Sequence, residues 1–150
     1  MSGVKLTDIV EKMNLKNLTP EVDITEREVL VPDVNRPALQ LAGFFDHFDL
    51  NRVQIIGNVE CAYLETLTEE RRLEIYQKLL EHKVPCIIFS NELQPDESFL
   101  ELAEKNDIPV FGTCKKTSSF MGELIRWLNV NLLRAFLFME CLLTYMVSGF

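Results

Sequence analysis

The sequence predicts an α/β fold with a mostly parallel sheet and flanking helices, and two observations carry this prediction. From residue 53 onward, short apolar runs alternate with stretches in which apolar residues recur at helical spacing. The runs at residues 53–57 and 85–90 are almost wholly apolar, as expected of parallel strands buried on both faces. This alternation favours right-handed crossovers that place successive strands side by side.

The first fifty residues are expected to add a strand and a helix to this sheet. Residues 8–13 form a short amphipathic pattern, with Thr7 or Asp8 as its helix cap. Residues 28–34 are rich in β-branched residues and predict a strand, which Pro32 interrupts.

Cap residues mark the starts of the later helices. Thr66 and Glu69 fit a capping box for the helix that follows. The apolar face of that helix comprises Leu73, Tyr76, Leu79 and Leu80. Asp96 is expected to cap the next helix, and the last helix buries a stripe of Phe120, Leu124, Trp127 and Leu128. The predicted helices cover residues 38–42, 59–65, 69–81 and 97–105, and a final one starts at Thr117 or Ser118.

Composition narrows the class of protein. The chain of 150 residues is 47% hydrophobic and carries a formal charge of −8, which suits one folded domain and disfavours nucleic-acid or anionic-membrane binding. The N-terminus has no apolar signal segment, and the four cysteines form no Cys-x-x-Cys pair. We therefore predict a cytoplasmic protein without a disulfide framework.

Recognisable catalytic motifs are absent from the sequence. It contains no Gly-x-x-x-x-Gly-Lys-Ser/Thr loop, no dinucleotide-binding glycine pattern and no zinc-protease or calcium-loop motif. Three functional interpretations are open, and the weakest is a free-standing enzyme in which His47, beside Asp46, acts as a general base. His82 is expected at a helix end.

Charged residues at loop corners supply the only candidate cluster, which is either a structural corner or an anion site. Asp33 is expected to cap a helix and pair with Arg36, or Arg36 binds an anion at that helix start. Lysines and hydroxyls before the last helix resemble a weak phosphate nest. The cluster comprises Asp33, Arg36, Arg52, Lys115, Lys116 and Thr117.

A second functional reading is a small-molecule-sensing module for a nucleotide or a sugar phosphate. Ligands of α/β sheets commonly bind at the carboxyl ends of the strands. Here these ends are expected at Gly57, Ser90 and Gly112, so the crevice would be lined by Glu60, Asn91 and Lys115.

The last 19 residues differ in composition from the rest of the chain. Residues 132–150 hold 14 apolar residues and two charges, Arg134 and Glu140. These charges disfavour a membrane span, which needs about 20 apolar residues with few or no charges. We expect the segment to build an oligomer or to be disordered, because it would otherwise expose a large apolar surface.

Five strings of residues stand out by their order and spacing. They are Asp33-x-x-Arg36-Pro37, Leu41-Ala42-Gly43-Phe44-Phe45, Arg52 to Gly57 with Glu60, Val84 to Ile88, and Ile108-Pro109-Val110 followed by Lys116-Thr117-Ser118. Together they resemble the N-terminal domain of HPr kinase/phosphorylase. The resemblance runs from about Leu6 to Leu128, and one departure is Ala38, where the family usually has glycine.

The resemblance implies an assembly or regulatory domain of a bacterial ATP-dependent protein-serine kinase and phosphorylase, which acts on the phosphocarrier protein HPr in carbon catabolite regulation. In that family the phosphate-binding loop and the ATP and magnesium sites lie in a C-terminal domain, so the resemblance assigns no catalytic, cofactor or metal residue to this chain. It also implies a homo-oligomer, hexameric in the family, and a fold similar to the N-terminal nucleotide-binding domain of muramyl ligases.

The resemblance also predicts that the last residues of the chain are translated in a different reading frame from the matching segment of the family. Read one nucleotide earlier, Phe138-Met139-Glu140 must encode His or Tyr followed by Gly, and Tyr145-Met146-Val147 encodes the same pair again. The family has a string like His-Gly-Val-Leu-x-Asp-Val-Tyr-Gly with this spacing. We therefore expect a domain over residues 1–131 and, over 132–150, an out-of-frame start of the kinase domain. The alternative is a genuine apolar C-terminal helix.

Overall fold

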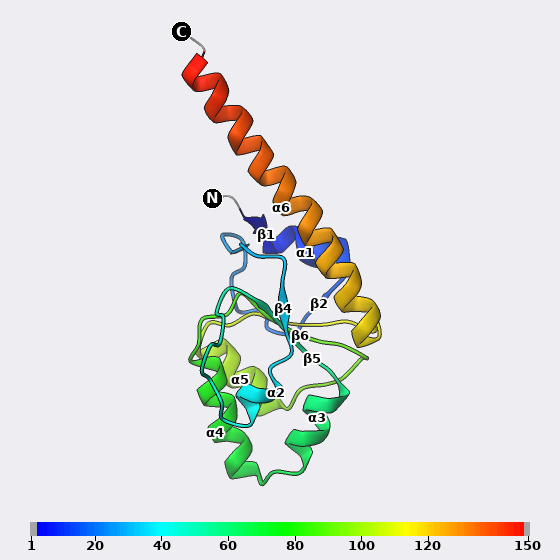
Figure 1. Ribbon diagram of the computed structural model, residues 1–150. Helices are drawn as coiled ribbons and strands as arrows, with labels where there is room; N and C mark the ends of the chain where they lie inside the picture. The colour runs from blue at the N-terminus through cyan, green and yellow to red at the C-terminus, as the bar shows by residue number, and fades with distance from the viewer. Residues whose placement is uncertain (1–2, 149–150) are drawn as a thin grey trace.

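A five-stranded sheet lies at the centre of the computed structural model, which describes residues 3–148 (Figure 1). Strands β4 to β7 are parallel and adjacent in sequence order, and β2 joins β7 in the antiparallel direction. The predicted α/β class with a mostly parallel sheet is therefore confirmed. In spatial order the strands are β2 (Lys16–Asn17), β7 (Val110–Gly112), β6 (Ile87–Phe89), β5 (Val53–Ile56) and β4 (Val34–Asn35).

Pro32 divides the strand predicted over residues 28–34 between two sheets. Its first part, β3 (Glu28–Val29), pairs antiparallel with β1 (Val4–Lys5), and its last part is β4. The prediction of one interrupted strand was wrong in this respect. Since proline lacks an N–H donor and fixes φ, the chain leaves one sheet here and enters another.

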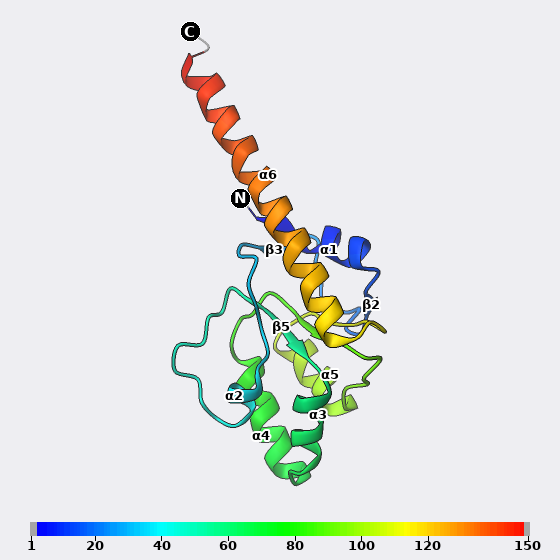
Figure 2. The same ribbon diagram turned by 45° about the vertical axis from the view of Figure 1, so that its right-hand side comes forward.

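Helices cover both faces of the sheet, as Figures 1 and 2 show. Along β6, Ile87 and Phe89 pack against one face, whereas Ile88 packs against the other. The first face carries α2 (Ala38–Leu41), α3 (Asn58–Glu65), α4 (Glu69–Leu80) and α5 (Glu97–Lys105). The opposite face carries α1 (Leu6–Met13) and the first part of α6 (Thr117–Ser148).

Two predicted caps are replaced by neighbouring residues. Lys5 precedes α1 without any side-chain cap, so Thr7 and Asp8 lie inside the helix. Thr68, not Thr66, caps α4, since its hydroxyl accepts a hydrogen bond from the Arg71 amide. The buried face of α4 also differs from the predicted one at Leu73, which is 37% exposed; the buried residues are Ile75, Tyr76, Leu79 and Leu80.

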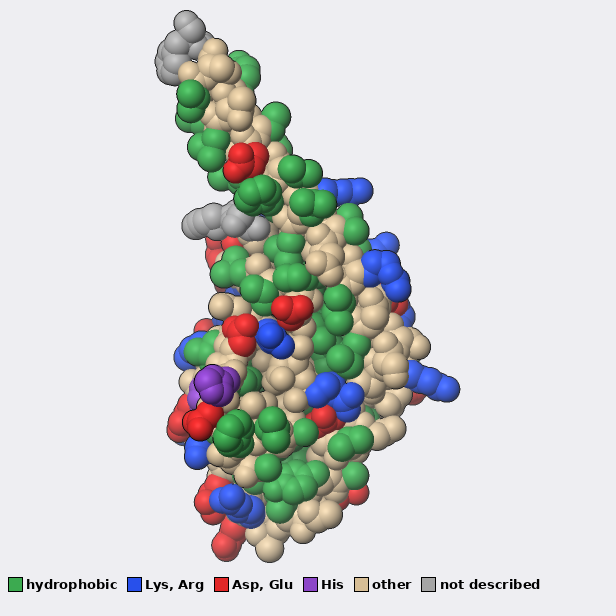
Figure 3. Space-filling view, viewed as in Figure 1, with side chains coloured by type: hydrophobic (Ala, Val, Ile, Leu, Met, Phe, Trp, Pro, Cys, Tyr) green, Lys and Arg blue, Asp and Glu red, His purple; other side chains and the backbone are tan. Residues whose placement is uncertain are grey.

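Helix α6 continues well beyond the domain. Phe120, Leu124 and Leu128 are buried and Trp127 is partly buried, which confirms the predicted stripe. After Leu132, which is partly buried, the helix projects away from the domain, and Figure 3 shows many hydrophobic side chains on the visible face of this projecting part. By length and composition α6 could cross a membrane. Its exposed apolar residues include Leu133, Phe136, Leu137, Phe138, Leu142, Leu143, Tyr145, Met146 and Val147.

Candidate functional site

The topology distributes the six predicted site residues between two edges of the sheet. Asp33 and Arg52 immediately precede β4 and β5, so they lie at the amino ends of the parallel strands. Arg36 follows β4, and Lys115, Lys116 and Thr117 follow β7, so these four lie toward the carboxyl ends. The six residues therefore do not form one cluster.

A buried ion pair lies at the carboxyl end of β5. The Arg36 Nη2 atom donates to Glu60 Oε1 at 2.6 Å, and the Glu60 side chain is only 2% exposed whereas that of Arg36 is 32% exposed. The same Glu60 oxygen accepts the Gly57 amide at 2.9 Å and so caps the start of α3. The predicted pairing of Arg36 with Asp33 is wrong, because Glu60 reaches Arg36 across the turn after β5.

Beside this ion pair, hydroxyl groups link β6 to the start of α6. Ser90 Oγ lies 2.5 Å from Thr117 Oγ1, which also accepts a hydrogen bond from Asn91 Nδ2 at 3.2 Å. Ser90 Oγ additionally donates to the Ile56 carbonyl at 3.3 Å. These bonds tie three segments together at one edge of the sheet.

Gly57 allows these groups to approach one another closely. A Cβ atom at this position would lie 2.7 Å from Thr117 Oγ1 and 2.8 Å from Arg36 Nη2, which is too close for either contact. Side chains of the domain itself thus pack closely around Gly57, at one of the three strand ends where the crevice is expected. Of its three expected lining residues, Glu60 is paired to Arg36, Asn91 bonds Thr117, and Lys115 pairs with Glu123 at 2.7 Å.

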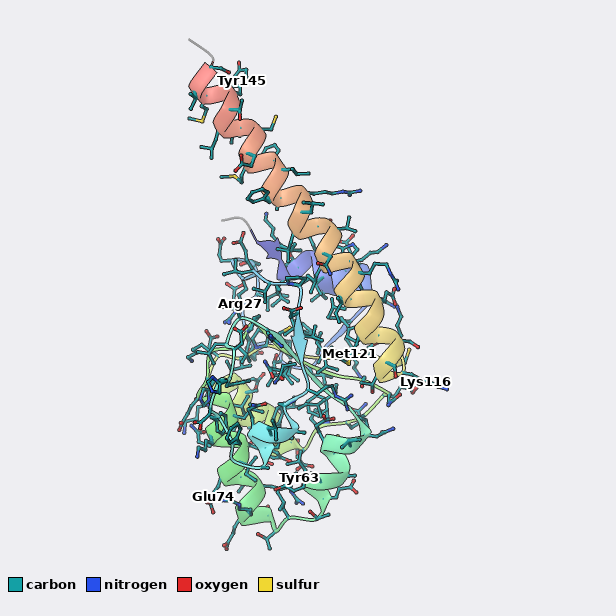
Figure 4. The ribbon with its side chains drawn as sticks, in the orientation of Figure 1. Arg27, Tyr63, Glu74, Lys116, Met121 and Tyr145 are labelled. Atoms are coloured by element: carbon teal, nitrogen blue, oxygen red, sulfur yellow. The ribbon has the colours of Figure 1, made fainter. Side chains whose placement is uncertain are left out.

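The remaining predicted residues take separate roles. Arg52 pairs with Asp49 at 3.3 Å, and Asp33 is exposed. Lys116 is exposed and points away from the start of α6 (Figure 4). The Arg36 Nε atom is buried and has no hydrogen-bond partner among the described residues. Whether an anion binds this edge stays a prediction, and the charge of Arg36 there is already balanced by Glu60.

The two histidines lie in different surroundings. His82 stacks on Phe45 with ring centroids 4.5 Å apart, and its Nδ1 atom lies 2.9 Å from the Lys78 carbonyl at the end of α4. His47 is exposed in a loop with φ of 63°. Within residues 3–148, no group of three or more histidine, cysteine or acidic residues is arranged to hold a metal ion.

Substituting Gly57 with alanine is expected to destabilise the domain by about 1–3 kcal/mol, because the new methyl group must displace Thr117 or Arg36. Chemical denaturation of both proteins measures this loss. Thr117→Ala in the same background removes the nearer clashing atom and should restore part of the stability. Gly122→Ala is the matched control, since a Cβ there meets no atom within 4 Å. An unchanged midpoint for Gly57→Ala would contradict the close approach.

The cysteines differ strongly in their expected reactivity. All four are free; Cys86 is buried, and burial raises its pKa to about 12, while burial and nearby carboxylates raise that of Cys61 to about 11. Because only the thiolate attacks, a thiol of pKa about 11 is ionised in about one molecule in a thousand at pH 8. With a chromogenic disulfide reagent at pH 8, we expect exposed Cys114 and Cys141 to react rapidly and the other two only after unfolding. Rapid labelling of four thiols in the native protein would contradict this.

A comparison with protein-family models shows to which family the chain belongs. A family model described as "HPr Serine kinase N terminus" matches residues 4–128. The chain belongs to this family. The match includes every strand of the central sheet, the Arg36–Glu60 pair and the first part of α6, and it ends before the projecting part of that helix.

Members of the HPr kinase N-terminal family are found among longer proteins. The chain is 54% identical over 132 residues to an HPr kinase/phosphorylase of Lachnoclostridium phytofermentans, covering 88% of this chain and 43% of the relative. It is 41% identical over 124 residues to one from Caldicellulosiruptor bescii, covering 83% and 40%. The chain thus spans less than half the length of these relatives.

A solved structure supports the fold assignment. The regulatory region of a Clostridium perfringens pyrophosphatase, with CBS and DRTGG domains and complexed with the activator diadenosine tetraphosphate, has a TM-score of 0.56 and 23% sequence identity to this chain. The likeness covers 83% of this chain and 46% of that one. At this identity it supports the α/β fold alone.

Proposed function

We propose that residues 1–131 act as a non-catalytic assembly or regulatory domain of an HPr kinase/phosphorylase, the protein-serine kinase and phosphorylase of carbon catabolite regulation. The observation that carries this proposal is the family match over residues 4–128 in a chain that has no phosphate-binding loop in its sequence. ATP and magnesium would bind the remaining part of the longer protein, and the phosphocarrier HPr would be its substrate. We propose a cytoplasmic homo-oligomer.

A domain exchange tests this proposal. The experiment joins residues 1–131 to the rest of the Lachnoclostridium phytofermentans relative, in place of its own matching segment. We expect the chimaera to phosphorylate HPr with magnesium–ATP and the present chain alone to transfer no phosphate. Phosphorylation of HPr by the chain alone would overturn the non-catalytic role. An inactive, folded chimaera would overturn the shared assembly or regulatory role.

We also propose that residues 132–150 are an out-of-frame reading of the segment that leads into the kinase domain. Support comes from the end of the family match at residue 128 and from the exposed apolar side chains that follow. Sequencing the DNA tests the idea. The out-of-frame hypothesis requires that the −1 frame encode His-Gly-Val and Tyr-Gly-Val-Gly, followed by a phosphate-binding loop. If the −1 frame lacks these strings, the hypothesis is wrong.

The charges of the tail support this assignment over a membrane anchor. A charged residue near the centre of a spanning helix costs about 2.5–3.5 kcal/mol in insertion experiments, whereas each leucine or phenylalanine contributes only about 0.3–0.6 kcal/mol. Glu140 lies near the middle of the exposed part of α6 and Arg134 near its start, six residues apart and therefore on different faces of the helix. Neither charge can neutralise the other within one helix.

A further inference from the structure

A small cavity lies between three helices on the face of the sheet opposite α6. It has a volume of about 120 Å³ and opens beyond the carboxyl end of β6. Its inner wall consists of Leu64, Tyr76, Phe89 and Phe99, each at most 7% exposed. Its mouth carries polar and charged residues, namely Glu65, Arg72, Gln94 and Asp96, and Cys61 also borders it.

Aromatic rings shape the inner wall of this cavity. The Phe99 ring meets Tyr76 at a centroid distance of 5.0 Å and Phe89 at 5.4 Å, both nearly perpendicular. Such an edge-to-face cluster offers ring faces and edges to a further ring. An engineered apolar cavity of about 150 Å³ in another protein holds benzene, so the volume here suits a single six-membered ring.

Asp96 supplies a carboxylate at the mouth of the cavity, and one of its two oxygens accepts no hydrogen bond from the described residues. Its Oδ2 atom accepts the Tyr76 hydroxyl at 2.6 Å and lies 3.5 Å from Arg72 Nε. Its Oδ1 atom has no partner among the described residues, and the Asp96 side chain makes no helix-cap bond. A hydrogen-bond donor that entered the cavity mouth could therefore bind this oxygen without displacing Tyr76.

The charge around the mouth determines which donor fits. Arg72 and Asp96 also line the adjoining surface hollow, whose other charged residues are all acidic: Glu69, Glu97 and Glu101. With Glu65, the two linings hold five carboxylates against one guanidinium, and the Arg72 Nη1 atom is already bonded to the Leu67 carbonyl at 3.3 Å. A cleft lined mainly by one sign of charge attracts the opposite sign and repels its own.

We propose that this cavity is a binding site for a small aromatic amine, whose ring packs against Phe89 and Phe99 and whose ammonium group binds Asp96. The site is separate from the Arg36–Glu60 edge and independent of the assembly role proposed above. Nucleotides and sugar phosphates are disfavoured here, because the phosphate would face the five carboxylates.

Three probes of similar size and different charge test the proposal: benzylamine, benzyl alcohol and benzoate. Each is titrated into the full chain while backbone and side-chain NMR shifts are followed. We expect benzylamine to perturb residues of the cavity and to bind about tenfold or more tightly than benzoate, with benzyl alcohol between them. Equal binding of the amine and the acid, or no saturable binding of the amine, would overturn the proposal.

Two variants locate the binding. Asp96→Asn keeps an acceptor for the Tyr76 hydroxyl but removes the charge, so it should abolish the preference for benzylamine over benzyl alcohol. Cys61→Phe should fill the cavity and block all three probes. Glu11→Gln, on α1 at the opposite face, is the matched control and should bind as the unmodified chain does. If Cys61→Phe fails to fold, Asp96→Asn alone decides, and unchanged benzylamine binding in that variant refutes the site.

Discussion

Replacing Arg36 with methionine is expected to lower the free energy of unfolding by about 3 kcal/mol, at the low end of the range for breaking a buried ion pair. The reason is that Glu60 is 2% exposed and would remain as a buried charge without its cationic partner, although the Gly57 amide would still donate a hydrogen bond to it. For a domain of this size the loss corresponds to about 10 °C in the melting temperature. Urea denaturation and thermal melting measure both quantities.

A double-mutant cycle separates the ion pair from the packing of Arg36. Glu60→Gln alone keeps an acceptor for the Gly57 amide and should cost about 1 kcal/mol. Arg36→Met combined with Glu60→Gln should be more stable than Arg36→Met alone, because no buried charge remains. The exposed pair Arg71–Glu74 is the control, and removing it should change stability by less than about 1 kcal/mol. Additive effects at Arg36 and Glu60 would contradict the coupling.

Removing residues 132–150 is expected to abolish self-association while the domain stays folded. The buried apolar residues of α6 end at Leu128, and the residues beyond Leu132 are largely exposed, so their loss removes no buried core side chain. The full chain presents a largely apolar helix to water, and burial of such a surface drives association by about 25 cal/mol per Å². Sedimentation velocity measures the association, and a thermal melt measures the folding.

Two further observations complete this test. Leu137→Glu with Leu143→Glu should also weaken association, since both side chains are more than half exposed and the helix otherwise keeps its length. A flotation assay with neutral lipid vesicles distinguishes self-association from insertion into a bilayer. A monomeric full chain, or a truncated chain that no longer melts cooperatively, would contradict the expectation. Flotation of the full chain would show instead that the tail prefers lipid.

Local patterns of the sequence predicted the elements of the parallel sheet closely. The apolar runs at 53–57 and 85–90 became β5 and β6, because strands buried on both faces need apolar residues at every position. The antiparallel edge strand β2 was not predicted. It has two exposed residues, Lys16 and Asn17, and is defined only by its pairing with β7. An exposed two-residue strand carries no periodic signal that could identify it.

The candidate site was predicted less well than the fold, for a physical reason. The partner of Arg36 is 24 residues away, and the sequence offers Asp33 as an equally charged and nearer alternative. The cavity residues were visible only separately, Tyr76 as part of a buried face and Asp96 as a helix cap. A dense run of acidic residues around positions 65–70 and 96–101 was the one available signal, and it does not reveal an enclosed volume.

The sequence by itself determined the α/β class, the family of the domain, the lack of a phosphate-binding-loop motif within these 150 residues and the strongly apolar composition of residues 132–150, because each depends on local periodicity or on strings of adjacent residues. Only the tertiary structure decided that Arg36 pairs with Glu60, that side chains pack closely around Gly57 and that a cavity opens between α3, α4 and α5. These features depend on which side chains the crossovers bring together at the ends of the strands, and contacts between distant segments leave no signal in the order of the residues.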